Sequence, residues 1–490
     1  YIGLLMNCLI LGWVTKAMIS IVSVVVGVSE HTALAICIFV IVPFTGFYVA
    51  IGGLWGVLWT DLFQFVLKMG VVIAVAYYGV TAAGGMHELL RKLQIAQPPV
   101  PAIPHGNPLK LFPDFSSGLS AETWWTLPVI TLLVYLGLQW WAFWYPGAEP
   151  GGGGYIAQRI FSAKDERQGM LSVLWFNIAH YALRPWPWIL VGLVAIVLYP
   201  NLDGSAAGRH PEDGYMLVLT QHLPASLRGL AIAGFLAAFM STIATQLNWG
   251  ASYLVADFYQ RFIKPEGSQK HYVFVSRIVT VFLVICAAIV AAQLASIQAG
   301  WQWVLELSAG TGAVYLLRWY WWRINAWSEI TAMVVALVTS LALRLLHPFS
   351  GNASVVFAKS ASTTTAVTTA AWLIVTFMTR PVSQEVLVRF YRHVRPDVRG
   401  WKHVAAIAKD VKPTRDLGRN LALWLLGCAM VYSFLFGAGY AILGHPTRGT
   451  ILLVIGIACL MLLLKQLRSF VEEPQAARKP GTETAAFIGH

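Results

Sequence analysis

Apolar residues run along this chain in long stretches, and the polar positions gather between the stretches rather than alternating with them. Many stretches are roughly 20 residues long, which is what a helix needs to cross about 30 Å of hydrocarbon. Lipid offers no partner for an unpaired backbone group and no alternating barrel pattern appears, so these stretches are predicted to be helices. We expect twelve spans, at 2–27, 32–54, 58–83, 123–145, 169–199, 226–257, 272–298, 300–323, 325–346, 361–379, 419–442 and 449–468.

The composition supports this class. The chain is 57% hydrophobic and 11% charged, with a mean hydropathy of +0.64, whereas a soluble protein carries roughly 25% charged residues. The five cysteines all lie in predicted spans without a CxxC pair, so they are interpreted as small hydrophobic residues. The chain is therefore predicted to be a polytopic membrane protein.

The net charge of +12 is concentrated rather than spread. Residues 380–419 hold ten Lys or Arg and four acids. If the basic loop 380–418 is cytoplasmic, alternation places 146–168, 258–271 and the C-terminus on the same side, as the positive-inside rule requires. The stretch "FYRHVRPDVRGWKHVAAIA" is then expected to be an interfacial helix near anionic lipid rather than a nucleic-acid site. We expect a multi-pass protein of the cell (plasma) membrane.

A polar motif interrupts the sixth predicted span. In "FLAAFMSTIATQLN", residues 235–248, Ala238, Ser241 and Thr242 stand at i, i+3 and i+4 and so share one helix face. One interpretation is close helix packing, with each hydroxyl bonded back to its own helix. The other is a Na⁺ site, because hydroxyls and freed carbonyls are the neutral oxygens that this hard cation accepts.

Four stretches resemble one known family, the sodium:solute symporter family. The first, residues 228–262, contains the pair Ser241-Thr242, then Asn248 and "ADFYQRF". The others are "GGLWGVLWTDLFQ" (52–64), "YIAQRIFSAKDERQG" (155–169) and "YLLRWYWWRINAWSEI" (315–330), and all occur in the family's order. Members of this family carry sugars, proline, pantothenate, iodide and related solutes.

The resemblance implies an all-α membrane fold with a leucine-transporter-like core of ten helices in two inverted five-helix repeats. By this alignment the chain lacks about the first three helices and enters the core at its third helix. The expected organisation is a symporter core and following helix at 1–345, C-terminal transmembrane helices at 346–468 and a cytoplasmic tail at 469–490. The resemblance assigns Na⁺ to Ala238, Ser241 and Thr242, with further carbonyls expected from the family's first core helix.

Other site residues are implied by position. Asp61, in "WTDLFQ", falls on the family's inner ion exit path. The alternative is that Asp61 is a solvated acid at the membrane interface. Gln302 falls where sugar-carrying relatives place a solute-contacting amide. Gln139 and Trp140 open an aromatic cluster that continues to Tyr145, which suits a sugar ring but also suits an interfacial aromatic belt.

Two further spans carry polar side chains. Asn177, His180 and Arg184 are expected on one stripe of the fifth span. Asn177 lies near a family position that reaches sugar hydroxyls. Arg184 would meet a solute carboxylate, form a structural ion pair or stack on Trp186 or a neighbour. Glu306 is an intramembrane acid and hence a functional candidate, for which a salt bridge to an unseen Lys or Arg is an equal alternative.

These observations predict sodium-coupled symport of a small polar organic solute, most simply a sugar or sugar acid. We expect no catalytic residue and no cofactor beyond the co-transported Na⁺, and a monomer whose partners are the solute, Na⁺ and the lipid bilayer, without nucleic acid. Alternatives are a symporter for an amino acid or another organic anion, and an input module for a signalling partner. A membrane enzyme using His180 lacks a visible partner nucleophile or acid.

Overall fold

The computed structural model describes residues 2–95, 109, 129–139, 160–200, 202, 211–294, 296–351 and 353–475, and its regular elements there are all helices. Within these ranges the side chains of 46–61 and 139 are among those not described. The chain forms two compact units. One contains 1–156 and 187–414, and the other contains 157–186 and 415–490.

The first unit holds most of the helices described, and five of its described elements are π-helical or 3₁₀ segments that continue or join α-helices. Its elements are α1 (Ile2–Val26), α2 (Glu30–Ile36), η1 (Cys37–Ile41), α3 (Val42–Ala82), α4 (Met86–Ile95), α5 (Val129–Val134), η3 (Tyr135–Gln139), most of α9 (Pro185–Leu198), η5 (Pro211–Asp213), α10 (Gly214–His222), α11 (Ala225–Ser252), η6 (Tyr253–Ile263), α12 (Gln269–Gln293), α13 (Ile297–Leu317), α14 (Ala326–Leu346), α15 (Ala353–Met378), α16 (Gln384–Val394), η7 (Val398–Gly400) and α17 (Lys402–Ala405).

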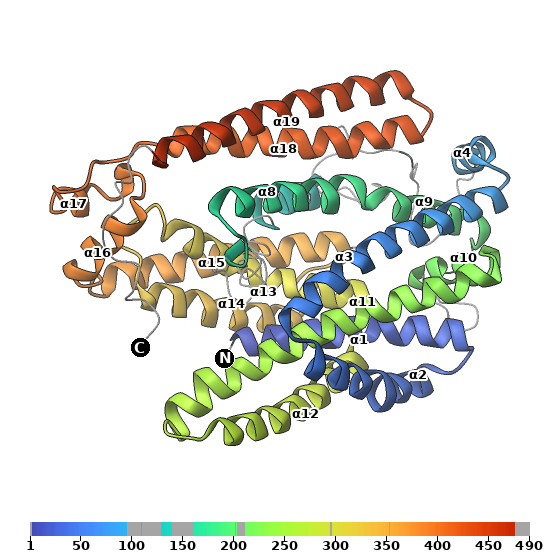
Figure 1. Cartoon of the computed structure of the whole chain (residues 1–490), viewed down its shortest axis with the longest axis horizontal. Helices are drawn as coiled ribbons and strands as arrows, with labels where there is room; N and C mark the ends of the chain where they lie inside the picture. The colour runs from blue at the N-terminus through green and yellow to red at the C-terminus, as the bar shows by residue number, and fades with distance from the viewer. Residues whose placement is uncertain are drawn as a thin grey trace. The chain divides into compact units, whose positions relative to one another are not determined.

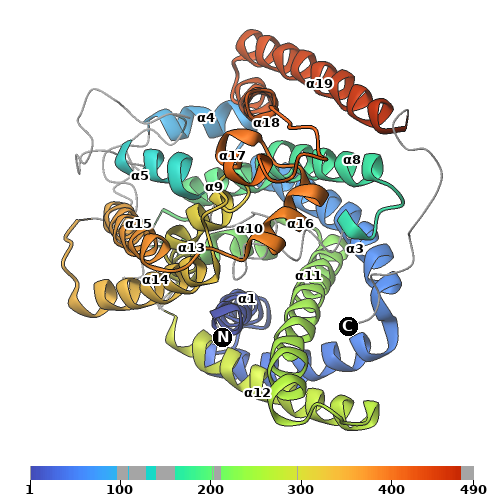
Figure 2. The same cartoon turned by 90° about the vertical axis from the view of Figure 1, so that its left-hand side faces the viewer.

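Helix α1 lies at the centre of the first unit. Viewed along the helices, α13, α14 and α15 gather on one side of α1, and α11 and α12 lie on the other (Figure 2). Leu11, Ile243 and Leu283 belong to the apolar cluster that joins α1, α11 and α12, while Met6 and Val304 belong to the cluster that joins α1 and α13. Helix α11 therefore packs directly on α1, α3 and α12.

Helix α3 differs from the sequence expectation. Two spans were predicted, at 32–54 and 58–83, but one α-helix runs without a break from Val42 to Ala82. The predicted boundary is wrong because glycines such as Gly53 and Gly56 cost a helix only about 1 kcal/mol each. No proline follows Pro43 before the helix ends.

Most of the twelve predicted spans agree with the structure. Over the described residues, nine helices are long and apolar enough to cross a membrane, and they correspond to nine of the twelve predicted spans. The threonine-rich span is among them, as 354–378. The other three are the predicted spans at 32–54, 123–145 and 300–323. Of these, the first is described as a shorter apolar helix at 30–45, the second over 129–138 and the third as α13.

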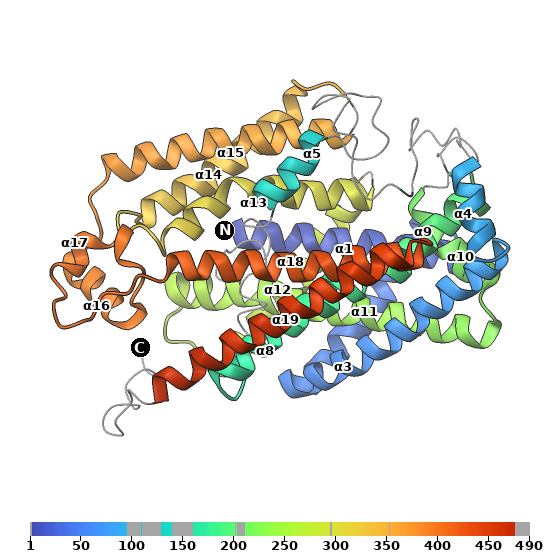
Figure 3. The same ribbon diagram turned by 90° about the horizontal axis from the view of Figure 1, so that it is seen from above.

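The second unit contains α8 (Glu166–Asn177), η4 (Ile178–Leu183), the first two residues of α9, α18 (Leu417–Ile442) and α19 (Pro446–Gln475). Helices α18 and α19 lie side by side as an antiparallel pair (Figures 1 and 3). Gly444 adopts a φ of 87° in the turn between them, and Pro446 begins α19, where its missing N–H costs nothing. Trp186 packs on α18 and donates from Nε1 to the Leu435 carbonyl at 2.6 Å.

A basic module, residues 383–414, follows α15. The stretch predicted as an interfacial helix is not one helix, because α16 ends at Val394, its C-cap Arg395 has a φ of 49°, and Pro396 prevents its continuation. Its location near lipid stays a prediction. The module is anchored to the turn after α13. Trp401 donates from Nε1 to the Trp319 carbonyl at 3.0 Å, and the Trp322 amide donates to the Gly400 carbonyl at 3.3 Å.

Candidate functional site

The hydroxyl motif lies on a face of α11 that the described residues cover only in part. Ala238, Ser241 and Thr242 are all half-buried, whereas Phe239 and Ile243, on the side packed against α1 and α12, are buried. The sequence therefore folds into one helix with an apolar packed side and a separate side that presents hydroxyls.

The two threonine hydroxyls on this face donate to the helix backbone. Thr242 donates from Oγ1 to the Ala238 carbonyl at 3.1 Å, and Thr245 donates to the Ser241 carbonyl at 3.0 Å. This is the back-bonding expected from the packing interpretation. It is also compatible with a cation, because a hydroxyl that donates its hydrogen keeps oxygen lone pairs to face an ion. A Na⁺ that took the Ala238 carbonyl as a ligand would compete with the Thr242 hydrogen bond.

The proposed ion exit residue, Asp61, lies in α3, but its side chain is outside the described residues. The backbone places it on a helix that packs along α11. The two elements that the resemblance assigns to the ion are therefore neighbours. The role of the Asp61 carboxylate stays a prediction.

Helix α13 brings one predicted solute residue into the first unit. Gln302 is half-buried, and its amide forms no hydrogen bond or ion pair with any residue in the described ranges. Helix α13 contacts η3, whose last residue is Gln139. The side chain of Gln139, and the whole of Trp140, lie outside the described residues. The structure thus brings the two predicted elements together, and the solute contacts stay predictions.

The polar stripe of the second unit is reshaped by a π-helical turn. Asn177 ends α8, and η4 then replaces the α-helical repeat with i to i+5 bonding. The expected alignment of Asn177, His180 and Arg184 assumed an unbroken α-helix, and η4 changes the rotation per residue between Asn177 and Arg184. His180 and Arg184 still lie together. Asn177 instead donates from Nδ2 to the Val173 carbonyl at 2.9 Å. Such π turns occur frequently at functional sites.

Arg184 has a neighbour that was not predicted. Its Nη1 lies 3.0 Å from Nδ1 of His180, and the His180 ring stacks on Phe176 with centroids 4.9 Å apart. No ion pair joins Arg184 to an acid among the described residues, and Trp186 uses its indole N–H on α18 instead. Among the alternatives for Arg184, no structural ion pair is present within those ranges.

Of the two alternatives for Glu306, the structure shows the ion pair. It is 7% exposed on α13, and its Oε2 lies 3.5 Å from Nε of Arg344 on α14. The Arg344 guanidinium also lies 4.7 Å from the centroid of the Trp303 ring. The partner was unforeseen because it lies on the next helix, 38 residues along the chain. A lone arginine near the end of an apolar span was the available signal.

These features define a class of protein: a multi-pass α-helical membrane protein with a hydroxyl-bearing helix and polar side chains inside its spans. The chain belongs to the sodium:solute symporter family, whose model matches residues 8–336. The family predicted from the sequence motifs is therefore confirmed.

Individual relatives carry different solutes. The chain is 27% identical over 322 residues to a sodium/glucose cotransporter of Vibrio parahaemolyticus, covering 61% of this chain and 55% of the relative. It is 24% identical over 301 residues to an osmoregulated proline transporter of Bacillus subtilis, covering 60% and 54%. It is 27% identical over 248 residues to sodium-coupled monocarboxylate transporter 2 of Bos taurus, covering 49% and 36%. The chain thus spans about half the length of the relatives it matches, or less.

A solved structure supports the fold. The structure of a Na⁺-coupled sialic acid symporter, in a substrate-bound outward-open state, matches with a TM-score of 0.56 and 18% sequence identity. The match covers 78% of this chain and 74% of that chain. At this level of identity the likeness establishes the fold alone. The leucine-transporter-like class expected from the sequence is confirmed.

Proposed function

We propose that this protein is a Na⁺-coupled symporter that moves a small polar organic solute across a membrane. The observation that carries the proposal is the face of α11, within the family-matched region, where the Ala238 carbonyl and the Ser241 and Thr242 hydroxyls stand together. These neutral oxygens suit a hard monovalent cation. Na⁺ supplies the driving force, because one charge moving through 100 mV releases about 2.3 kcal/mol, which corresponds to roughly 50-fold solute accumulation.

The ion site is tested by removing one oxygen at a time. Ser241→Ala and Thr242→Ala should each raise the half-saturating Na⁺ concentration of solute uptake by about ten- to a hundredfold, since a hydrogen bond or similar contact to a charged group contributes about 1.5–3 kcal/mol. Thr280→Ala is the matched control, because Thr280 on α12 is also half-buried and donates to its own helix, at the Ser276 carbonyl 2.8 Å away.

The result that supports the ion site is a raised Na⁺ requirement in both α11 variants with no change in the Thr280 variant. If all three variants keep the parent Na⁺ dependence, the hydroxyls of α11 serve helix packing. Uptake that is equal in Na⁺ and in choline for the parent protein overturns the symporter proposal itself.

We further propose a sugar or sugar acid as the solute. Gln302 offers an amide without a described partner, and Arg184 offers a cation whose described neighbour is a histidine rather than an acid. The relatives' names include glucose, proline and monocarboxylate carriers at 24–27% identity, so their similarity does not choose among these classes. The choice rests on the side chains.

Arg184→Gln separates the two solute classes. If the guanidinium meets a solute carboxylate, the variant should lose uptake of uronates and keep uptake of neutral sugars, because only the charged contact is removed. A parallel loss of both, together with lower protein yield, would assign Arg184 to the structure of η4. Na⁺-driven uptake of proline, with no response to any sugar or uronate, contradicts the sugar proposal.

A further inference from the structure

A buried amide pair joins α1 to the helix that carries the hydroxyl motif. Asn7 on α1 is 3% exposed and Gln246 on α11 is 9% exposed. The Asn7 amide donates from Nδ2 to the Gln246 side-chain Oε1 at 2.7 Å and to the Gln246 backbone carbonyl at 2.8 Å. One side chain thus holds both the side chain and the main chain of a residue on the neighbouring helix.

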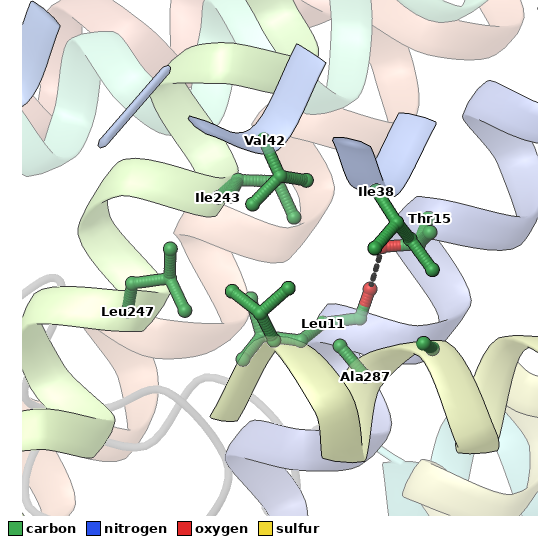
Figure 4. A pocket seen from close by; sticks show the side chains of 9 residues that line it. Leu11, Thr15, Ile38, Val42, Ile243, Leu247 and Ala287 are labelled. Atoms are coloured by element: carbon green, nitrogen blue, oxygen red, sulfur yellow. Dashed lines mark hydrogen bonds between the residues drawn. The ribbon is translucent and has the colours of Figure 1, made fainter. Parts of the chain in front are cut away.

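The layer next to this pair is apolar and loosely filled. Leu11 and Thr15 of α1 face Ile243 and Leu247 of α11 across a small cavity, with Ala287 of α12 at its edge (Figure 4). The Thr15 hydroxyl is turned to its own helix, where it donates to the Leu11 carbonyl at 2.7 Å. This layer therefore offers apolar contact without a polar tie between α1 and α11.

The sequence makes room for the amide. A Cβ added at Gly250, one turn beyond Gln246, would lie 2.5 Å from Oδ1 of Asn7 and 2.7 Å from Leu283. The glycine lets the Asn7 amide reach the backbone of α11. Oδ1 has no hydrogen-bond partner among the described residues, so the donating side of the amide is what fixes the pair.

The pair lies close to the proposed ion face along α11. Gln246 follows Thr242 by four residues, which is about one turn of an α-helix. Apolar surfaces fix the register of membrane helices weakly, because lipid is as apolar as the partner helix. A slip of one residue would turn the α11 face by about 100° and move it by about 1.5 Å. The hydrogen bond from the Asn7 side chain to the Gln246 backbone carbonyl, one turn away, opposes such a slip directly.

We propose that Asn7 is a positioning residue for Na⁺: by holding Gln246, it sets the rotation and height at which α11 presents Ala238, Ser241 and Thr242. This proposal rests on the Na⁺ site proposed above. Asn7 does not contact the ion. Loss of the Asn7 amide displaces the three Na⁺ ligands together, so it weakens Na⁺ binding more than solute binding.

The test compares Na⁺ affinity with protein stability. Asn7→Leu and Gln246→Leu, each in the protein reconstituted in liposomes, should raise the half-saturating Na⁺ concentration about three- to tenfold, while the solute KM at saturating Na⁺ stays within about twofold. The double variant should be no worse than either single variant, because both remove the same contact. Gly250→Ala perturbs the pair from the other side and should shift the Na⁺ requirement in the same direction.

Asn325→Ser is the matched control. Asn325 is 7% exposed and its Nδ2 also donates between segments, to Thr379 Oγ1 at 2.9 Å and the Arg380 carbonyl at 3.2 Å. Serine keeps the capping oxygen that α14 needs. This variant should lower the unfolding temperature without changing the Na⁺ requirement. Na⁺-dependent thermal stabilisation, with K⁺ as the blank, provides a second measure of Na⁺ affinity that does not need transport.

The two proposals fail in different ways. If the parent protein responds to Na⁺ and Ser241→Ala weakens that response, but Asn7→Leu and Gly250→Ala do not, the positioning role is refuted and the ion site stands. Equal losses of Na⁺ affinity and solute affinity in the Asn7 variant, matched by the Asn325 control, also refute it. If neither uptake nor thermal stability of the parent protein depends on Na⁺, the ion site itself is refuted, and the positioning role that rests on it falls as well.

Discussion

Arg344→Met should destabilise the protein more than Glu306→Gln, although the two changes remove opposite ends of one ion pair. The Glu306 side chain is 9% exposed and the Arg344 side chain is 39% exposed. Removing the arginine leaves a carboxylate buried between helices without its cation. Removing the carboxylate leaves a guanidinium that already reaches the surface and lies over the Trp303 ring.

The magnitude follows from this asymmetry. Removing one partner of a fully buried pair costs about 3–5 kcal/mol, most of it from the charge left behind. Since Arg344 is partly exposed, we expect about 2–3 kcal/mol for Arg344→Met, including the loss of its contact with Trp303. Glu306→Gln should cost about 1 kcal/mol, because an amide has no charge to desolvate. The double variant should return close to the Glu306→Gln value.

The assay is the thermal unfolding of the four proteins in one detergent, followed by tryptophan fluorescence. Ranking the variants avoids reliance on an equilibrium free energy, which membrane proteins that unfold irreversibly do not provide. The expected order is parent, Glu306→Gln, double variant and Arg344→Met, with the middle two close together. The reasoning is refuted if Arg344→Met unfolds with the parent, or if adding Glu306→Gln fails to recover stability.

Three further outcomes are expected. Gln302→Ala should raise the solute KM by about five- to a hundredfold with little change in Na⁺ response, as the loss of a buried partner costs about 1–3 kcal/mol; unchanged KM removes it from the site. Gly439→Ala should lower the unfolding temperature, since its Cβ would overlap an indole ring, whereas Gly427→Ala on the same helix meets open space and should not. Hydrogen bonding to Arg392 lowers the pKa of Asp410, so proteolysis of the basic module should stay constant from about pH 8 to 5 and rise only below the usual Asp range.

Much of the fold was predictable because long apolar stretches leave few alternatives in a membrane. The motif stretches then identified the family, because they preserve residue types in a fixed order. The boundary inside α3 was missed for a local reason: the glycines near 52–56 resemble a break, yet a helix tolerates them. The stripe through Asn177 and Arg184 was distorted by η4, and π-helical turns carry no clear pattern in a single sequence.

The partners of the polar side chains were much harder to predict. Asn7 and Gln246 are 239 residues apart in sequence, and each looks like an isolated amide in an apolar span. The pairing of Arg344 with Glu306 was equally hard to predict, because the order of helices in the sequence does not reveal which of their faces meet. Side-chain pairing depends on rotation about each helix axis, and apolar periodicity is weak where helices are apolar on most sides.

The anchoring of the basic module has a consequence for mutational surveys. Any side chain at Gly400 would overlap the Tyr320 carbonyl, and the Gly400 carbonyl accepts from the Trp322 amide. The position should therefore reject every substitution, including alanine, as strictly as an ion ligand does. A deep mutational scan scored by growth would mark substitutions at both Gly400 and Ser241 as harmful. Intolerance to substitution alone therefore does not distinguish a residue of the transport pathway from a residue that anchors the basic module. Measuring the Na⁺ dependence of uptake in each variant does.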